Sequence, residues 1–277
     1  MRRWNVSGIA ATVLALDLIA ATAPAQAQGK RGSSPEAQEA AARYAAADVR
    51  VMVPGIVYSA GLLDLAAAYT KETGKKVAVA SVGMGNIVNA VKTANPAADV
   101  VSLPFELMST LSLDGGIVAG TFMPLGRSEM GLAVHSGAVH PDISTVEKLA
   151  IALRAAKAVM RSNPAGGSMV AKVIEDKVIK RPELAGVNSP ISTQGEGARA
   201  LERGEGDMAI QAISEILPSQ QIELVGPLPR ELAAWIDMSL AVSARSAHRE
   251  DALAFLKYLL RPDSTAVWTA KGLERFK

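Results

Sequence analysis

The residues whose types and spacing most directly suggest chemistry form one short polar stretch, residues 161–168, which reads Arg-Ser-Asn-Pro-Ala-Gly-Gly-Ser. An apolar run at 158–160 precedes it, and a helical pattern at 169–178 follows it. A strand that turns directly into a helix gathers unpaired backbone N–H groups and the positive end of the helix dipole, which favours an anion. Arg161 would add a guanidinium able to grip a carboxylate through two parallel hydrogen bonds. The alternative is an ordinary strand–loop–helix connection with a surface arginine.

Two further loops place polar or glycine residues after an apolar run. Tyr58 and Ser59 come after the first run and after Pro54 and Gly55, which predict a turn, whereas residues 83–86 come after the second. Successive strand–loop–helix units indicate a parallel sheet whose ligand lies outside the carboxyl ends of its strands. These loops are therefore expected along one rim. The expected strands are 49–53, 77–82 and 98–103, and the expected helices are 62–74, 86–95 and 105–113.

The rest of the chain predicts a second lobe built in the same way. A strand at 129–134 would leave the first lobe, and a long strand at 236–243 would return to it. Two α/β lobes joined by two crossings form a hinge, and the cleft between them is the expected ligand site. Lobe 1 would comprise residues 48–130 and 237–277, and lobe 2 residues 131–236. The other expected elements are strands 158–160, 208–211 and 222–225 and helices 145–156, 169–180, 198–203 and 248–260.

Composition removes several classes of function. The 277-residue chain has a formal net charge of only +2 and few aromatic residues, so a nucleic-acid-binding surface is not expected. It contains no cysteine, and its three histidines, His135, His140 and His248, do not have the spacing of a zinc site. No GxSxG elbow or Walker loop occurs. We therefore expect no metal and no cofactor.

The N-terminus has the layout of a secretory signal peptide. Arg2 and Arg3 precede an apolar run at 9–16, and small-residue cleavage patterns end at Ala25 and Ala27. The run is shorter than the ~20 residues of a membrane-spanning helix. We assign residues 1–27 to the signal peptide and residues 28–47 to a flexible mature N-terminus with one frayed helical turn. A cysteine-free exported chain is expected in the periplasm.

Four segments taken together resemble the periplasmic molybdate-binding proteins and their relatives among the type II solute-binding proteins. They read LAAAYTKETGKKV at 65–77, NPAADVV at 95–101, VGPLP at 225–229 and ALAFLKYLL at 252–260, with Pro262 shortly after. The resemblance extends from about residue 49 to 276. It implies the two-lobed hinged fold and a ligand held in the interlobe cleft by hydroxyl and main-chain N–H groups. It also implies a monomer, with an inner-membrane transporter as a candidate partner.

This sequence differs from the molybdate-binding proteins at the positions whose side chains hold the ligand in that family. Where molybdate binders carry two serines and a tyrosine, this chain has Val57, Met84 and Ala212. The main-chain donors of the family align with Gly167 and with residues 194–195. A tetrahedral oxyanion without those hydroxyls would leave polar atoms unpaired, at a cost of about 1–3 kcal/mol each. Molybdate is thus disfavoured, although Met84 can equally be a packing residue.

Larger or more cationic side chains stand near these positions, which favours a planar organic anion such as a di- or tricarboxylate. The candidates are Tyr58, Asn86, Arg161 and Gln211, although Gln211 could simply end a buried strand. The complete set of expected ligand-binding residues is Tyr58, Ser59, Met84, Gly85, Asn86, Arg161, Gly167, Ser168, Gln194, Gly195 and Gln211.

Three functions remain open at this stage. The first is capture of a small organic anion, and the second is transport-linked binding of molybdate or tungstate. The third is cofactor-free isomerisation of an unsaturated tricarboxylate, because the resemblance extends to aconitate isomerase. That reaction needs a group that moves a proton at a carbon beside a carboxylate. The candidates are Tyr58, Glu106 and Glu196, and none of them stands in a catalytic motif.

Overall fold

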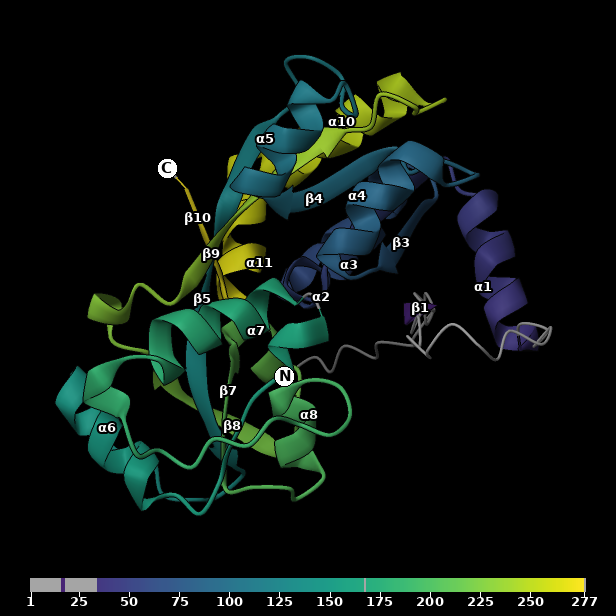
Figure 1. The fold of residues 1–277 in the computed structure, drawn as a ribbon. Helices are drawn as coiled ribbons and strands as arrows, with labels where there is room; N and C mark the ends of the chain where they lie inside the picture. Colours follow the sequence, from purple (N-terminus) through teal and green to yellow (C-terminus); the bar gives the residue numbers. More distant parts are fainter. Residues whose placement is uncertain (1–15, 18–33, 167, 277) are drawn as a thin grey trace, which may run out of the picture.

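The computed structural model describes residues 16–17, 34–166 and 168–276 as two lobes of mixed α/β structure (Figure 1). Its strands form one hydrogen-bonded path in the order β1-β3-β2-β4-β9-β5-β7-β6, and β8 and β10 also pair with β5. The strands are β1 (Leu16–Asp17), β2 (Val49–Val53), β3 (Val77–Ser81), β4 (Val100–Pro104), β5 (Met123–His135), β6 (Val159–Met160), β7 (Met208–Ala212), β8 (Ile222–Pro227), β9 (Trp235–Val242) and β10 (Leu273–Arg275).

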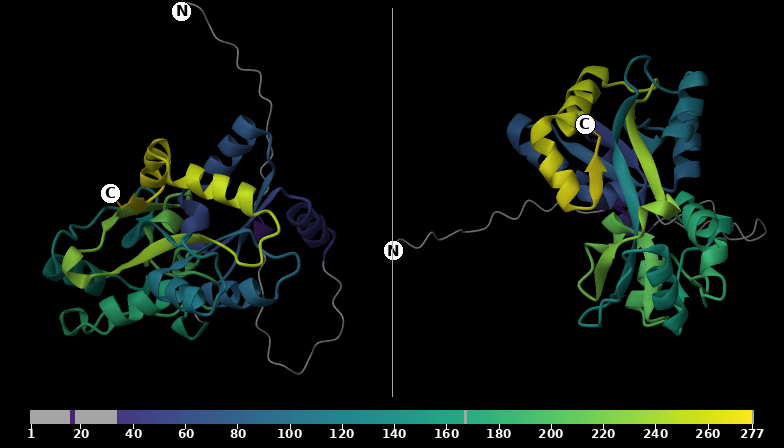
Figure 2. Two further views of the ribbon diagram at one scale, coloured as in Figure 1. Left: turned by 90° about the horizontal axis from the view of Figure 1, so that it is seen from above. Right: turned by 90° about the vertical axis from the view of Figure 1, so that its left-hand side faces the viewer.

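Helices cover this sheet in both lobes. In the upper lobe of Figure 1, α10 and α11 lie on one face of the sheet and α5 on the other (Figure 2). The helices are α1 (Pro35–Ala45), α2 (Gly55–Val57), α3 (Leu63–Thr73), α4 (Met84–Thr93), α5 (Phe105–Leu113), α6 (Val146–Ala155), α7 (Met169–Ile174), α8 (Gly197–Glu202), α9 (Ile213–Ile216), α10 (Arg249–Leu260) and α11 (Thr265–Ala270).

Strand β5 is shared by the two halves of the sheet. From Met123 to Glu129 it pairs with β9, and from Met130 to His135 it pairs with β7 and β8. In the upper half, β2 is parallel to β3 and β4, while β9 returns antiparallel to β4. The carboxyl ends of β2 and β3 therefore meet at one edge of the sheet, as the strand pattern predicts.

The apolar runs of the sequence correspond closely to strands. The β2 prediction of 49–53 is confirmed in both bounds, and all five of its residues are buried, which explains why four of them are apolar. The helix expected to stop near Gly74 does so, because Gly74 takes a left-handed conformation with φ of 75° at the end of α3. The mixed α/β, two-lobed class is therefore confirmed.

Three local expectations were wrong. The segment before β2 is a regular 11-residue helix, α1, because Ser34 caps it and Pro35 begins it. The expected turn at Pro54 and Gly55 is instead the start of α2, which reaches α3 through an irregular turn at Ala60 and Gly61. Strand β5 begins at Met123 rather than at 129, since its first half pairs with β9 and β10.

The signal-peptide prediction falls almost entirely outside the described residues. Within the expected leader, only the two residues of β1 are described, and they pair with the edge of β3 beside Ala80 and Ser81. Among the described residues, no helix has both the length and the apolar character needed to cross a bilayer.

Candidate functional site

A cavity of about 630 Å³ lies between the two lobes. It opens at the carboxyl ends of β2 and β3 and at the start of α4, where the fold predicts a ligand. The opposite wall comes from the loop between β6 and α7, the start of α8, and α9. The lining residues are Pro54, Gly55, Ile56, Ser81, Val82, Gly83, Met84, Gly85, Asn86, Ser162, Asn163, Ser168, Met169, Val170, Gly195, Glu196 and Glu215.

A second cavity of about 560 Å³ adjoins the first and shares part of its wall. The shared residues are Gly55, Ser81, Gly195, Glu196 and Glu215. The second cavity continues past this wall towards α3, α8 and the end of α11. It adds the side chains of Tyr58, Ser59, Asp64, Arg199 and Lys271. The two spaces together form an elongated interlobe cleft.

The structure brings most of the expected site residues to this cleft. Met84, Gly85, Asn86, Ser168, Gly195 and Glu196 line the first cavity, and Tyr58 and Ser59 line the second. Gly167 lies outside the described residues. Gln194 lines neither cavity, and its main-chain carbonyl accepts hydrogen bonds from Ser192 and Arg203. Glu106 on α5 also lies outside both linings.

Arg161 lies away from the cavity that its sequence context suggests. Its Nη1 is 2.7 Å from Oε2 of Glu175, and its Nε donates to the carbonyl of Ser189 at 3.1 Å. The guanidinium therefore joins the strand end to the segment after α7, and Arg161 lines neither cavity. What reaches the cleft from this loop is Ser162, Asn163 and Ser168.

This geometry predicts that Arg161 acts on stability more than on ligand affinity. Replacing Arg161 with Gln should lower the melting temperature, since Glu175 would lose its partner in a half-buried setting. The dissociation constant of a bound anion should change less than about threefold, or about 0.6 kcal/mol. Calorimetric titration and thermal unfolding of the same variant measure both effects. A large loss of affinity without a change in melting temperature would instead show that Arg161 contacts the ligand.

Gln211 lies behind the first cavity rather than in its wall, and it is almost completely buried. Its Oε1 accepts from the hydroxyl of Ser162 at 3.1 Å, and its Nε2 donates to Oε2 of Glu215 at 2.6 Å. Gln211 therefore positions two residues that do line the cavity. The sequence predicts that Gln211 contacts the ligand, whereas in this structure it contacts the cavity only through Ser162 and Glu215.

Glu215 is one of several cleft residues that the sequence did not predict, with Ser81, Ser162, Asn163, Arg199 and Lys271. It lies on α9, lines both cavities, and approaches lobe 1 at Gly55, where a Cβ would meet its Oε1 at 2.5 Å. Burial between the lobes, followed by the negative charge of Glu196, raises the pKa of Glu215 well above the usual range of a glutamate. Nothing in the short pattern around 213–216 points to this environment.

The three positions that align with the hydroxyl ligands of molybdate binders differ in their access to the cleft. Val57 and Ala212 are fully buried and line neither cavity, whereas Met84 does reach the first one. Hydroxyls nevertheless enter the cavity from Ser81, Ser162 and Ser168. The carboxyl groups of Glu196 and Glu215 line the same cavity.

No group of three or more His, Cys, Asp or Glu side chains among the described residues is arranged to hold a metal ion. Neutral donors and two glutamates therefore set the chemistry of the first cavity.

Comparison with protein families gives a match over residues 49–274 to the bacterial extracellular solute-binding proteins. The chain belongs to this family. The solute-binding protein is also 28% identical over 215 residues to an aconitate isomerase from a Pseudomonas species, covering 76% of this chain and 82% of that enzyme. It is therefore a distant homologue of an enzyme as well as a member of a binding-protein family.

Solved structures show the same fold at low sequence identity. The periplasmic molybdate-binding protein of Azotobacter vinelandii matches with a TM-score of 0.65 and 16% identity, over 83% of this chain and all of that one. The sulfate-binding protein SubI of Mycobacterium tuberculosis matches with a TM-score of 0.61 and 17% identity, over 82% and 86%. The solute-binding protein thus has the type II periplasmic binding protein fold.

Proposed function

We propose that this solute-binding protein captures a small organic anion with two or three carboxylates in the interlobe cleft. The observation that carries the proposal is the pair of adjoining cavities with different chemistry. The first is lined by hydroxyl and amide groups and by the N-terminal turn of the 10-residue helix α4. The second contains Arg199 and Lys271. An elongated anion could engage both, which a compact tetrahedral oxyanion could not.

Neutral donors suit the inner part of such a site. Backbone N–H groups at Gly85 and Asn86, in the first turn of α4, lack partners within the helix and favour negative charge. Ser81 and Asn86 add side-chain donors. The cations of the second cavity are exposed, because Lys271 is 49% and Arg199 62% accessible. They would attract and orient an anion more than they would bury its charge.

A second candidate function is isomerisation of an unsaturated tricarboxylate. The specific observation is that Glu196 and Glu215 both approach Gly55 at the wall shared by the two cavities. A carboxyl with a raised pKa beside an ionisable partner is suited to giving and removing a proton at neutral pH. The homology with aconitate isomerase supports the same candidate. Proton NMR of cis-aconitate incubated with the protein would reveal the trans isomer if this function holds.

The cellular setting follows from the same proposal. The family is one of extracellular solute-binding proteins, and the N-terminal leader pattern supports export to the periplasm. There a monomeric binding protein would deliver its ligand to an inner-membrane transporter. Fractionation of cells that produce the full chain, with N-terminal sequencing of the exported form, tests the proposed export. An uncleaved cytoplasmic chain would contradict it.

Thermal unfolding with a panel of anions tests the proposed ligand class. The panel contains cis- and trans-aconitate, citrate, succinate, sulfate, molybdate and tungstate. A ligand at 100 times its dissociation constant stabilises the folded state by about 2.7 kcal/mol. For a chain of this size that corresponds to a rise in melting temperature of about 5–10 °C. We expect this rise with a polycarboxylate, and a rise with molybdate and tungstate alone would contradict the proposal.

A further inference from the structure

A chain of hydrogen bonds ends on the carboxyl group of Glu215. The main-chain N–H of Gly197, at the start of α8, donates to Oγ of Ser162 at 3.2 Å. That hydroxyl donates to Oε1 of Gln211 at 3.1 Å, and Nε2 of Gln211 donates to Oε2 of Glu215 at 2.6 Å. In this arrangement the hydroxyl of Ser162 accepts from Gly197 and donates to Gln211, and the Gln211 amide turns its N–H group towards Glu215. Oε2 of Glu215 is therefore an acceptor.

The other oxygen of Glu215, Oε1, lies next to the backbone of lobe 1 at Gly55, a residue that lines both cavities. A Cβ built on Gly55 would lie 2.5 Å from Oε1 of Glu215 and 3.7 Å from Oε1 of Glu196. Both carboxyl groups therefore approach the same point on the backbone of lobe 1. Both also line the two cavities. Any proton carried by Glu215 resides on Oε1, because Oε2 already accepts from Gln211.

The charged groups around this pair lie on α8, on α3 and at the end of α11. Arg199 on α8 is the cation with the largest effect on Glu215, but it is exposed and pairs with Glu202 at 2.8 Å. Lys271, at the end of α11, lies 3.7 Å from Asp64 on α3. Tyr58 lines the second cavity beside them. These cations have acidic partners of their own, so they offset only part of the repulsion between two ionised glutamates.

We propose that Glu215 and Glu196 hold one proton between them, and that Oε1 of Glu215 donates it in a hydrogen bond to a carboxylate oxygen of the captured anion. The inference rests on the proposed anion-binding function and assigns Glu215 as a specificity-determining residue. A neutral acid attracts a carboxylate, whereas two ionised glutamates repel it. The protein thus takes up its ligand together with a proton whenever the free pair is ionised.

The coupling has a definite sign. Burial, followed by the charge of Glu196, raises the pKa of Glu215, so at low pH the pair already carries its proton and affinity does not vary with pH. Above the pKa of the free pair, binding must first add one proton. Affinity then falls by up to about tenfold per pH unit. An anion bound only through N–H groups and hydroxyls would show no such dependence.

Calorimetric titration with trans-aconitate over the range from pH 6 to about pH 9 tests the coupling. Carboxyl groups of ordinary pKa near 4 are ionised throughout this range, so the ligand itself supplies no proton change. At each pH the titration is repeated in buffers of different ionisation enthalpy. The slope of the binding enthalpy against that quantity gives the protons taken up per ligand. We expect a slope that rises from zero towards one as affinity falls.

The Glu215→Gln variant tests whether binding depends on the titration of Glu215, because it keeps the shape and the hydrogen bonds of this side chain. The amide keeps an oxygen for Gln211 and an N–H that faces the cleft, but it does not titrate. We expect affinity within about threefold of the native protein at its low-pH limit, no pH dependence and no proton uptake. Glu231→Gln is the matched control, since Glu231 is exposed and lines neither cavity. That variant should keep the native pH profile.

The outcomes distinguish this inference from the function on which it rests. Binding with constant affinity and no proton uptake would overturn the inference and leave the binding function intact. If none of the panel anions binds, the proposed function fails and the coupling fails with it. The pair can also be followed without ligand through the side-chain carboxyl signals of protein labelled with carbon-13 glutamate. Ordinary pKa values for both glutamates there would overturn the inference independently.

Discussion

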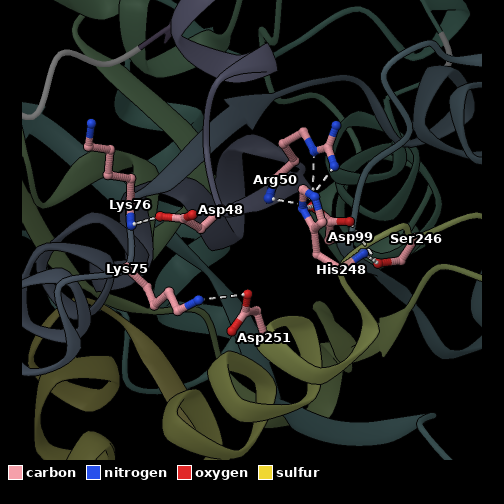
Figure 3. Close-up of polar contacts among 8 residues, drawn as sticks. All are labelled: Asp48, Arg50, Lys75, Lys76, Asp99, Ser246, His248 and Asp251. Carbon is pink, nitrogen blue, oxygen red and sulfur yellow. Dashed lines mark hydrogen bonds and ion pairs between the residues drawn. The ribbon is translucent and has the colours of Figure 1, made fainter.

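Replacing Asp99 with Asn is expected to lower the free energy of unfolding by about 3–5 kcal/mol, because it breaks a buried ion pair. Asp99 is completely buried just before β4. Its Oδ2 accepts from the backbone N–H of Arg50 at 2.8 Å and from Nε of Arg50 at 3.0 Å (Figure 3). Its Oδ1 accepts from the hydroxyl of Ser246 at 2.7 Å. An asparagine amide is neutral, so the charge of Arg50 would lose its buried counter-charge, and it has one acceptor oxygen, so the donors to one of the two positions would also be left unpaired.

The reason for so large an effect is that this carboxylate joins three distant parts of lobe 1. Arg50 belongs to β2, and Ser246 precedes α10. Nη2 of Arg50 also lies 3.0 Å from Nδ1 of His248 (Figure 3), and since a guanidinium can only donate, that nitrogen is the acceptor. Tyr44 of α1 packs close by, and burial followed by the charge of Asp99 raises its pKa. Loss of the carboxylate would disturb all of these contacts.

Asp251→Asn is the control for this prediction. Asp251 also carries a lysine partner in Figure 3, with Oδ2 3.1 Å from Nζ of Lys75, but the two side chains are 33% and 44% exposed. Exposed pairs of this kind contribute about 0–1 kcal/mol. Urea unfolding of both variants measures the two effects. Equal losses in the two proteins would show that the Asp99 network is not a special source of stability.

The sequence predicts the sheet well because each strand carries its own signal. Four of the five residues at 49–53 are apolar because β2 is buried throughout, and the exception, Arg50, is paired with Asp99. Residues 84–86 follow β3, so they lie at the carboxyl ends of the parallel strands, where they line the first cavity. Such residues are predictable because a local pattern and a topological rule are sufficient.

The chemistry of the cleft depends on partners that a local pattern does not contain. Arg161 has the residue type of a carboxylate ligand, yet Glu175, 14 residues later, occupies its guanidinium. Glu215 has no motif, and its raised pKa arises from Glu196 and from burial between lobes that meet only in three dimensions. Helix α1 is longer and more regular than the one frayed turn expected in this segment, because Ser34 and Pro35 form a helix start that the composition of residues 28–47 does not reveal.

Gly55→Ala is expected to raise the dissociation constant of a bound polycarboxylate by at least about tenfold, equivalent to about 1.4 kcal/mol. The φ of Gly55 is compatible with alanine, so the effect comes from the added methyl group alone. That methyl would lie 2.5 Å from Oε1 of Glu215, well inside van der Waals contact. The carboxyl cannot simply withdraw, because Gln211 holds its other oxygen at 2.6 Å.

The displaced carboxyl would have to move into the cleft or towards Glu196, whose Oε1 is 3.7 Å from the same point. Either movement removes the donor from its place opposite the ligand and strengthens the repulsion between the two glutamates. Gly226→Ala is the matched control, since the nearest atom to its added methyl is Cδ1 of Ile143 at 3.9 Å and Gly226 lines neither cavity. Calorimetric titration of both variants should show the loss only for Gly55→Ala. A native affinity in that variant would mean that the position of the Glu215 carboxyl does not determine binding.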